Sequence, residues 1–466
     1  MQYEFGMIGL GTMGRNLLLN LADHGEAVAG LDLDASKVEL LKQEGTGKPV
    51  EGFTDAKAFM ASLRTPRVVM MLVPAGPPVD KVIESLSPYL EKGDLVIDGG
   101  NSFFRDTERR FNELGAKGLA FFGIGVSGGE KGARFGPSMM AGGPAESYER
   151  MRPLLEKVAA KADDGEPCVA LFGPGAAGHY VKMVHNGIEY ALMQSIAEVY
   201  DLLRRQVGMN NPKMADIFEE WSTSEIGGFL LQITSTVLRK RDPETGLDLV
   251  DLVKDGAKSK GTGKWTSQDA MDLHVAVPSV DAAVSARDIS ALFDERHAAA
   301  SILKPSEAKP PVLSNDQLKG ALAVTMVAAY AQGMNQLRAA GTEYGYGIDV
   351  AKAAAVWRAG CIIRSELLGK ITQAYRANAQ LANLLVAPGL SDFVLQHLPG
   401  MRAVISGAVN AGIPVPALSA SLSYVDGYGS SRLPANLIQA QRDFFGAHTY
   451  ERLDQPGVFH TDWSES

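Results

Sequence analysis

The chain has 466 residues, of which 45% are hydrophobic and 21% are charged, a balance typical of a soluble globular protein with two or three domains. Its net charge of −9 disfavours nucleic acid as a partner, and the two cysteines, Cys168 and Cys361, are too far apart in sequence to suggest a disulfide framework or a thiolate metal site. No stretch approaches the ~18 to 20 apolar residues of a membrane span, and the first residues lack a signal-peptide pattern, so we expect a cytoplasmic protein without a membrane partner.

A glycine-rich turn follows the first predicted strand. Residues 3–8 form an apolar run that predicts a buried strand, and residues 15–24 have helical spacing. Between them, Gly9 permits a tight turn, Gly11 lets the backbone approach a pyrophosphate, and Gly14 allows the helix to pack closely on the strand. This strand, turn and helix predict a dinucleotide site with the helix N-terminus facing the phosphates, formed by Gly9, Gly11, Thr12, Met13 and Gly14.

The second predicted strand, residues 27–33, leads into an acidic sequence about 20 residues past the last glycine, where an acid would accept a hydrogen bond from a ribose 2′-hydroxyl. We therefore assign Asp32, Leu33 and Asp34 to the cofactor site.

Further predicted strands at 67–73, 94–98 and 121–125 alternate with segments of helical length, which is the pattern of a doubly wound α/β sheet. The last two end in loops of small and polar residues. Ligands in such sheets lie beyond the carboxyl ends of the strands, so these loops are candidates for substrate contact, although ordinary turns have a similar composition. The candidates are Asn101, Ser127, Gly128 and Gly129, and we place Val73 and Asn101 beside the cofactor as well.

Strand patterns nearly vanish after residue 177, and long segments rich in Ala, Leu, Met and Gln predict an all-helical domain. Two stretches of it look alike. Trp221 precedes Leu-Leu-Gln-Ile-Thr at 230–234, and Trp357 precedes Leu-Leu-Gly-Lys-Ile-Thr at 367–372, with offsets of 136 residues at the tryptophan and 138 at the Ile-Thr pair. We interpret this similarity as an internal repeat of a helical unit, of which only the first copy carries reactive side chains.

The most reactive sequence lies at the start of this helical domain. Lys182, His185, Asn186, Glu189 and Tyr190 are spaced i, i+3, i+4, i+7 and i+8, so they share one stripe of a helix. This polar stripe suits proton transfer on a small anionic substrate. The simpler alternative is a solvated helix face with a charge pair.

A lysine-rich loop follows at residues 258–265, Lys-Ser-Lys-Gly-Thr-Gly-Lys-Trp. Its glycines would expose backbone N–H groups and Lys260 would supply charge, which suits a phosphate or a carboxylate, and Arg287 is near enough in sequence to join it. A solvated basic loop fits the same sequence equally well. The last segment is too aromatic to remain in water, so we expect it to dock on a surface such as that of a second subunit, through Phe444, Phe445, Phe459 and Trp463.

The glycine-rich turn, the polar stripe, the Ser-Gly-Gly loop, the lysine-rich loop and the Gln-Arg-Asp-Phe-Phe-Gly-Ala-His run at 441–448 together resemble the 6-phosphogluconate dehydrogenase family. The resemblance implies a Rossmann-type dinucleotide-binding domain at 1–176, an all-helical substrate and dimerisation domain at 177–433, and a tail at 434–466. It also implies oxidative decarboxylation of 6-phosphogluconate to ribulose 5-phosphate and CO₂, with reduction of NAD or NADP, in the pentose phosphate pathway.

The same resemblance implies a homodimer in which each tail enters the partner subunit and brings Arg442 and His448 to its active site. Lys182 would be the base once its pKa is lowered, and Glu189 would be the acid that protonates the enediol. His185 and Asn186 would orient the substrate, and no metal is indicated. The other substrate contacts implied are Asn101, Ser127, Gly128, Gly129, Tyr190, Lys260 and Arg287.

The chain departs from the family near the second strand. The family usually has an Asn-Arg-Thr type sequence there, whose arginine holds the 2′-phosphate of NADP, whereas this chain has Asp32-Leu33-Asp34. Pro74 also stands where a lysine is common. Because a carboxylate would repel a 2′-phosphate, we predict a preference for NAD over NADP.

Two alternatives remain open at this stage. A β-hydroxyacid dehydrogenase would share the glycine-rich turn and the catalytic lysine, but it would not need Lys260, Arg287 or the tail. A cofactor-sensing protein without turnover would not need an intact Lys182 and Glu189.

Overall fold

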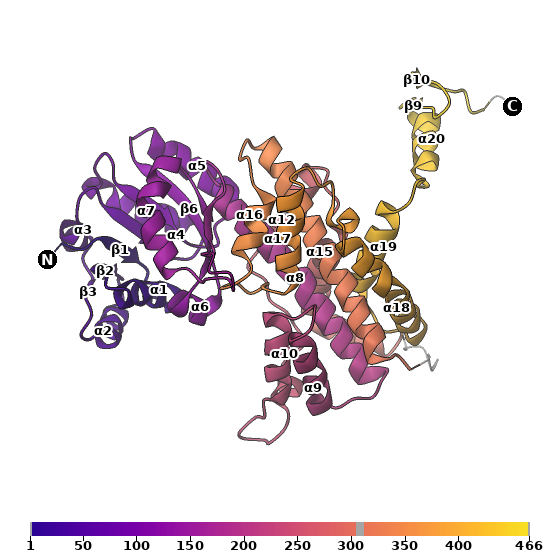
Figure 1. Cartoon of the computed structure of the whole chain (residues 1–466), viewed down its shortest axis with the longest axis horizontal. Helices are drawn as coiled ribbons and strands as arrows, with labels where there is room; N and C mark the ends of the chain where they lie inside the picture. The colour runs from indigo at the N-terminus through magenta and orange to yellow at the C-terminus, as the bar shows by residue number, and fades with distance from the viewer. Residues whose placement is uncertain (1, 304–311, 465–466) are drawn as a thin grey trace. The chain divides into compact units, whose positions relative to one another are not determined.

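The computed structural model describes residues 2–303 and 312–464. It forms two compact units, Met1–Ser421 and Leu422–Ser466. The first unit contains an α/β part and an all-helical part (Figure 1). The boundaries at 176 and 433 that the sequence suggests stay a prediction.

The α/β part is built on an eight-stranded sheet of order β3-β2-β1-β4-β5-β6-β7-β8, in which every pair is parallel except β6 with β7. The strands are β1 Phe5–Ile8, β2 Val28–Leu31, β3 Val50–Phe53, β4 Val68–Met71, β5 Leu95–Asp98, β6 Ala120–Ser127, β7 Ser138–Gly142 and β8 Val169–Leu171. The predicted Rossmann-type architecture is confirmed. The sequence pattern had missed β3, β7 and β8.

Helices cover both faces of this sheet, so alternate side chains of each strand enter two separate apolar cores. Met7, Met70 and Ile97 belong to one core, whereas Ile8 and Val69 belong to the other. The helices are α1 Thr12–Asp23, α2 Ala35–Glu44, α3 Ala56–Ser62, α4 Pro77–Leu86, η1 Ser87–Tyr89, α5 Phe104–Gly115, α6 Gly129–Phe135 and α7 Ala145–Val158.

The rest of the first unit is helical, as predicted, and α15 packs on both α8 and α18 (Figure 1). Its helices are α8 Ala177–Arg205, α9 Asn211–Ser222, α10 Phe229–Arg239, α11 Leu249–Leu252, α12 Thr262–Asp272, α13 Pro278–Ala291, α14 Phe293–Ala300, α15 Asn315–Glu343, α16 Val350–Val356, α17 Leu367–Ala377, η2 Leu384–Val386, α18 Leu390–Ala411 and α19 Pro416–Tyr428. Among the described residues, no helix is long and apolar enough to cross a membrane.

Two series of three helices follow the proposed repeat: α8, α9 and α10 in the first copy, and α15, α16 and α17 in the second. Helices α8 and α15 both have 29 residues. The segments that precede α10 and α17 pair with each other in antiparallel fashion through Gly228 and Ser365. Antiparallel pairing of corresponding segments is the arrangement that a local two-fold axis would produce.

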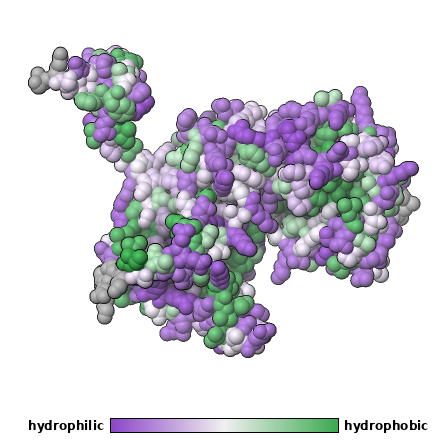
Figure 2. Space-filling view, turned by 180° about the vertical axis from the view of Figure 1, so that it is seen from behind, coloured by the Kyte–Doolittle hydropathy of each residue, from purple (hydrophilic) through white to green (hydrophobic). Residues whose placement is uncertain are grey.

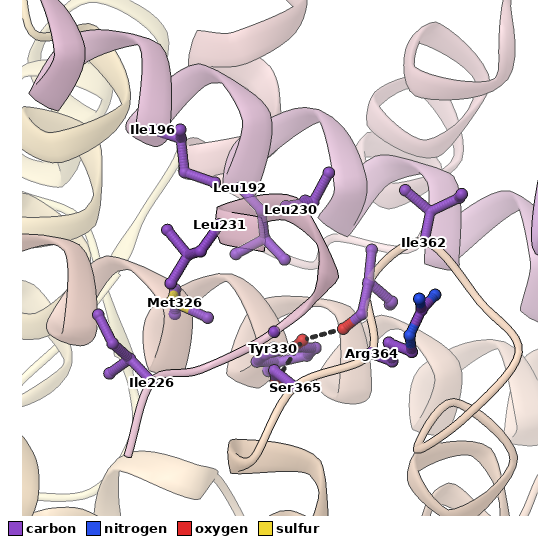
Figure 3. Close-up of a pocket in the computed structure, with 12 residues that line it drawn as sticks. Leu192, Ile196, Ile226, Leu230, Leu231, Met326, Tyr330, Ile362, Arg364 and Ser365 are labelled. Atoms are coloured by element: carbon purple, nitrogen blue, oxygen red, sulfur yellow. Dashed lines mark hydrogen bonds between the residues drawn. The ribbon is translucent and has the colours of Figure 1, made fainter. Parts of the chain in front are cut away.

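A small apolar cavity lies where these two series meet (Figure 3). Leu192, Leu231 and Met326 line it, and Tyr330 donates a hydrogen bond of 2.6 Å to the carbonyl of Ile363 at its edge. Its volume of about 10 Å³ has room for no more than about one water molecule, so it is not a ligand site.

The second unit contains the end of α19, helix α20 Ala435–Gly446, and the strands β9 Tyr450–Glu451 and β10 Val458–Phe459, which pair in antiparallel fashion. Figure 2 shows apolar atoms on its surface, and the exposed apolar side chains include Leu437, Ile438, Phe444 and Phe445.

Candidate active site

Helix α8 lies directly against the sheet because glycines remove side chains from the contact. A Cβ on Gly178 would lie 2.4 Å from the carbonyl oxygen of Gly123, and a Cβ on Gly125 would lie 2.3 Å from the Cβ of Lys182. Both distances are shorter than the closest contact that non-bonded atoms can make. The close approach brings Lys182 against β6, the strand that ends at Ser127.

His185 occupies the centre of the polar stripe. Its Nδ1 atom lies 3.3 Å from Lys182 Nζ, 3.0 Å from Asn186 Oδ1 and 3.8 Å from Glu189 Oε2, and its Nε2 atom lies 3.3 Å from Ser127 Oγ. A neutral ring that donates from Nδ1 to Asn186 can accept a hydrogen bond from Ser127 at Nε2. The stripe and the loop after β6 therefore form one hydrogen-bonded group.

The burial of the stripe excludes the alternative of a solvated helix face. Lys182, His185, Asn186 and Tyr190 are buried, and Glu189 keeps only 22% of its side chain exposed. The opposite face of α8 is buried too, as expected from its apolar residues Val184, Ile188 and Ala191.

Burial changes the proton affinity of Lys182, His185 and Glu189. It lowers the pKa of Lys182, although the charges of Glu189 and Cys361 oppose this shift. Burial and the nearby Lys182 charge hold the pKa of His185 well below its usual value. Burial raises the pKa of Glu189, against the opposing charges of Lys182 and Arg287. These shifts favour a neutral imidazole, make the neutral amine of Lys182 more available as a base, and make the protonated carboxyl of Glu189 more available as an acid.

The Asn101 loop at the end of β5 is shaped by the buried carboxylate of Asp98. Its two oxygens accept hydrogen bonds from the backbone N–H of Gly100 at 3.0 Å and the hydroxyl of Ser102 at 2.6 Å. Asn101, which lies between these two partners, is exposed at the carboxyl end of the sheet. The hydrogen bonds of Asp98 therefore fix the conformation of the loop, which leaves the amide side chain of Asn101 exposed.

The Ser127 loop is supported by a segment that sequence reasoning did not assign to the site. Gly128 has φ +118°, and a Cβ there would lie 2.5 Å from the carbonyl oxygen of Gly360. The indole of Trp357 meets the imidazole of His185 edge to face, with 5.6 Å between ring centroids. The sequence pattern had marked Trp357 only as part of the repeat, and no local signal connected it with His185.

The lysine-rich loop and Arg287 meet the stripe at Tyr190. The guanidinium of Arg287 stacks over the Tyr190 ring at 3.4 Å from its centroid, and Arg287 also donates to the carbonyl of Lys258 at 3.4 Å. A Cβ on Gly263 would lie 2.5 Å from the same tyrosine ring. Lys260 is exposed. The structure therefore brings Arg287, Tyr190 and this loop together, as the sequence suggests.

The glycine-rich turn has the geometry that a dinucleotide requires. A Cβ on Gly9, which has φ +88°, would lie 2.5 Å from Leu72 O, and one on Gly14 would lie 1.9 Å from Gly9 O. Gly11 faces open space and begins α1 without a side-chain cap. The first turn of α1 therefore keeps backbone N–H groups available for a pyrophosphate.

A groove of about 490 Å³ adjoins this turn and fits the adenosine half of the cofactor. The carboxylate of Asp32 accepts hydrogen bonds from the backbone N–H groups of Leu10 at 2.8 Å and Asp34 at 2.9 Å. The Leu33 side chain is 91% exposed at the rim of this groove. Sequence reasoning had missed two lysines here, Lys37, whose Nζ lies 3.5 Å from Asp32, and Lys81. Both lie on helices that follow a strand of the sheet, which was a usable signal.

Arg442 and His448 belong to the second unit, so their place at the site stays a prediction. Within that unit, Arg442 donates to the side-chain oxygen of Gln439 at 3.0 Å. Among the residues that the structure describes, no cluster of three or more His, Cys, Asp or Glu side chains could hold a metal ion.

A Rossmann-type sheet with a glycine-rich turn, next to a buried lysine and histidine and a partly buried glutamate, defines an NAD(P)-dependent oxidoreductase. Two family models match the chain: the NAD binding domain of 6-phosphogluconate dehydrogenase over residues 4–173 and the C-terminal domain of 6-phosphogluconate dehydrogenase over residues 178–463. The chain belongs to the 6-phosphogluconate dehydrogenase family, which sets aside the β-hydroxyacid dehydrogenase alternative.

Individual relatives match over the full length. The chain is 48% identical to the decarboxylating 6-phosphogluconate dehydrogenase of Escherichia coli K12, covering 99% of both chains. It is 46% identical to an NADP(+)-dependent, decarboxylating enzyme of Bacillus subtilis, again covering 99% of both. A solved 6-phosphogluconate dehydrogenase of Plasmodium falciparum has a TM-score of 0.94 at 37% identity, covering 99% of this chain and all of that one.

Proposed function

We propose that the chain oxidises and decarboxylates 6-phosphogluconate to ribulose 5-phosphate and CO₂, with NAD as the preferred electron acceptor. The observation that carries this proposal is the buried group of Lys182, His185 and Glu189 beside Ser127, at the carboxyl end of β6. The names of the relatives from E. coli and B. subtilis support the decarboxylating reaction. A cytoplasmic location remains a prediction.

Lys182 would begin the reaction as a base. Its lowered pKa makes the neutral amine accessible, and the neutral amine removes the proton of the C3 hydroxyl group while C3 loses hydride. The nicotinamide of the bound cofactor supplies the chemistry of hydride acceptance. The lysine is then an ammonium group, and it stays within hydrogen-bond reach of the new C3 carbonyl.

The protonated Lys182 would next assist the loss of CO₂. As the C1–C2 bond breaks, its electron pair forms the C2–C3 double bond, and the ammonium returns its proton to the C3 oxygen. The resulting enediol needs a proton at carbon. Glu189, whose pKa is raised, would donate that proton, because a protonated carboxyl group is available at higher pH than usual. Lys182, neutral again, would remove the proton of the C3 hydroxyl group, so that the C3 carbonyl of the product forms as the carbon is protonated.

Charged side chains around the stripe would hold the substrate phosphate and carboxylate. Arg287 is fixed over Tyr190, and Lys260 is exposed in the lysine-rich loop. Arg442 and His448 of a partner subunit would complete the set. This arrangement supplies local positive charge in a chain whose net charge is −9.

The residues at the rim of the adenosine groove support a preference for NAD. The carboxylate of Asp32 remains able to accept a hydrogen bond from a ribose 2′-hydroxyl, and Leu33 and Pro74 supply no cation there. Lys37 is the nearest cation, but it is close to both Asp32 and Asp34, which offset its charge.

Exchange of the rim sequence tests this preference. Assays of NADH and NADPH formation with 6-phosphogluconate should give a higher kcat/KM with NAD. The triple variant Asp32→Asn, Leu33→Arg, Asp34→Thr should shift the ratio towards NADP by about 100-fold, since it removes a repulsive carboxylate and adds a bidentate phosphate donor. The threonine introduced in place of Asp34 can still cap α2. Glu39→Gln, an exposed change on α2, is the control, and a clear NADP preference of the natural chain would overturn the proposal.

A further inference from the structure

The interior of the C-terminal unit is organised around a carboxylate. Among the described residues of α20, Asp443 alone is buried, whereas its neighbours Phe444 and Phe445 are 65% and 72% exposed. Interiors usually hold apolar side chains, and an ionised carboxylate is tolerated there only when its oxygens are hydrogen-bonded. The position of Asp443 therefore depends on its partners.

Four donors from the tail, residues 434–466, surround this carboxylate. Oδ1 accepts from the backbone N–H of Thr449 and from His460 Nδ1, both at 2.9 Å. Oδ2 accepts from the backbone N–H of Thr461 at 3.1 Å and from Trp463 Nε1 at 2.8 Å. Asp443 thus joins α20 to the turn that follows it and to the segment beyond β10.

The turn that Asp443 holds is strained. Ala447 has φ +49° and Thr449 has φ +61°, so both neighbours of His448 adopt the left-handed conformation that residues with a side chain seldom adopt. Such residues persist where the surrounding contacts determine their conformation. The contacts here are the hydrogen bond from Thr449 to Asp443 and another from the Gln439 side chain to Thr449 O at 2.6 Å.

We propose that Asp443 is a positioning residue for the substrate site, because it fixes Arg442 and His448 relative to each other before the tail meets the substrate. Arg442 directly precedes Asp443 on α20, and His448 lies in the turn that its carboxylate holds. The inference rests on the proposed function, in which these two side chains contact 6-phosphogluconate. A preformed arrangement lowers the entropy lost on binding, so its loss affects substrate affinity more than the chemical step.

Matched substitutions in the full-length protein test the inference. Asp443→Asn keeps the shape of the side chain but replaces one carboxylate oxygen with an NH₂ group. This hydrogen-bond donor would face two N–H groups that are donors themselves. It should raise KM for 6-phosphogluconate about 10- to 100-fold, the effect of losing a hydrogen bond to a charged group, with a much smaller change in kcat and none in the Kd of NAD. Asp454→Asn, in the same tail at an exposed ion pair with Arg452, should leave KM unchanged.

A structural readout and a double-mutant cycle complete the test. Trp463 fluorescence should change in Asp443→Asn, because the indole loses its acceptor, and Trp463→Phe should raise KM in the same direction by a smaller factor. In a His448→Ala background, Asp443→Asn should add little to KM.

Three results would overturn the inference: an unchanged KM in Asp443→Asn, an equal rise in Asp454→Asn, or effects of Asp443→Asn and His448→Ala that simply multiply. Absence of turnover with 6-phosphogluconate in the natural chain would instead refute the proposed function.

Discussion

In the proposed reaction Lys182 is the base, and its lowered pKa arises because the protein surrounds it with the sheet, the imidazole of His185 and the segment of Cys361 rather than with water. The closeness of α8 to β6, which glycine at 125 and 178 permits, produces that burial. A side chain at either glycine would push α8 away from β6. Two residues without side chains are therefore as necessary to the site as the reactive ones.

Replacement of Lys182 by alanine should lower kcat by a factor of about 10² to 10⁴, the usual contribution of a general base. The Kd of NAD, measured by fluorescence titration, should stay the same, because the cofactor groove lies at other residues. Lys213→Ala, an exposed lysine on α9, provides the control. Unchanged turnover in Lys182→Ala would show that the base lies elsewhere.

The pH dependence of kcat/KM should be bell-shaped. In the proposed mechanism activity requires a deprotonated Lys182, whose pKa is lowered, so it should rise as pH increases and this lysine loses its proton. It also requires a protonated Glu189, whose pKa is raised, so it should fall as pH increases and this carboxyl group ionises. Glu189→Gln should reduce kcat by about 10²-fold or more and leave only the rising dependence. A falling limb that survives in this variant would assign it to another group.

At the scale of the elements, the sequence was sufficient to predict a helix or strand where the hydrophobic and polar pattern was local and regular. The polar stripe, the glycine-rich turn and the strands flanking it lie where predicted, because each is specified by residues of one short continuous segment. The strands β3, β7 and β8 were missed. They are only 3 to 5 residues long, and glycine or methionine occupies positions in β3 and β7 where β-branched residues would have indicated a strand.

Contacts between distant segments could not be predicted from periodicity. The contact of Trp357 with His185 joins the two helical series across more than 170 residues of sequence, and that of Gly360 with Gly128 joins the second series to the α/β part. The residues next to Trp357 and Gly360 in sequence do not indicate which distant residue each one contacts.

Helices α8 and α19 are joined by the buried carboxylate of Glu198, which accepts the backbone N–H groups of Ala417 at 2.8 Å and Leu418 at 2.9 Å. Glu198→Ala should lower the free energy of unfolding by about 3 kcal/mol, since it leaves two buried donors without an acceptor at the start of α19. Urea unfolding measures this loss, with the exposed Glu220→Ala as the control. A loss no larger than that of the control would mean that water replaces the carboxylate.

At the scale of the whole molecule, the proposal of tail exchange predicts complementation between inactive subunits. A Lys182→Ala chain and an Arg442→Ala chain should each turn over poorly. After they are unfolded and refolded together, about a quarter of the natural activity should return, because half of the randomly paired dimers are hybrids with one intact site each. Light scattering should show a dimer. No recovery from a confirmed hybrid would place Arg442 in the site of its own subunit.

The equal lengths of α8 and α15 have a consequence for the history of the chain. Counted from the start of each helix, the positions of Lys182, His185 and Glu189 correspond to Gly320, Ala323 and Val327 in α15. The second helix thus carries small and apolar residues at the places where the first carries its chemistry. If one ancestral unit gave rise to both, the protein contains its own catalytically silent counterpart, and comparing the two helices separates the residues kept for packing from those acquired for turnover.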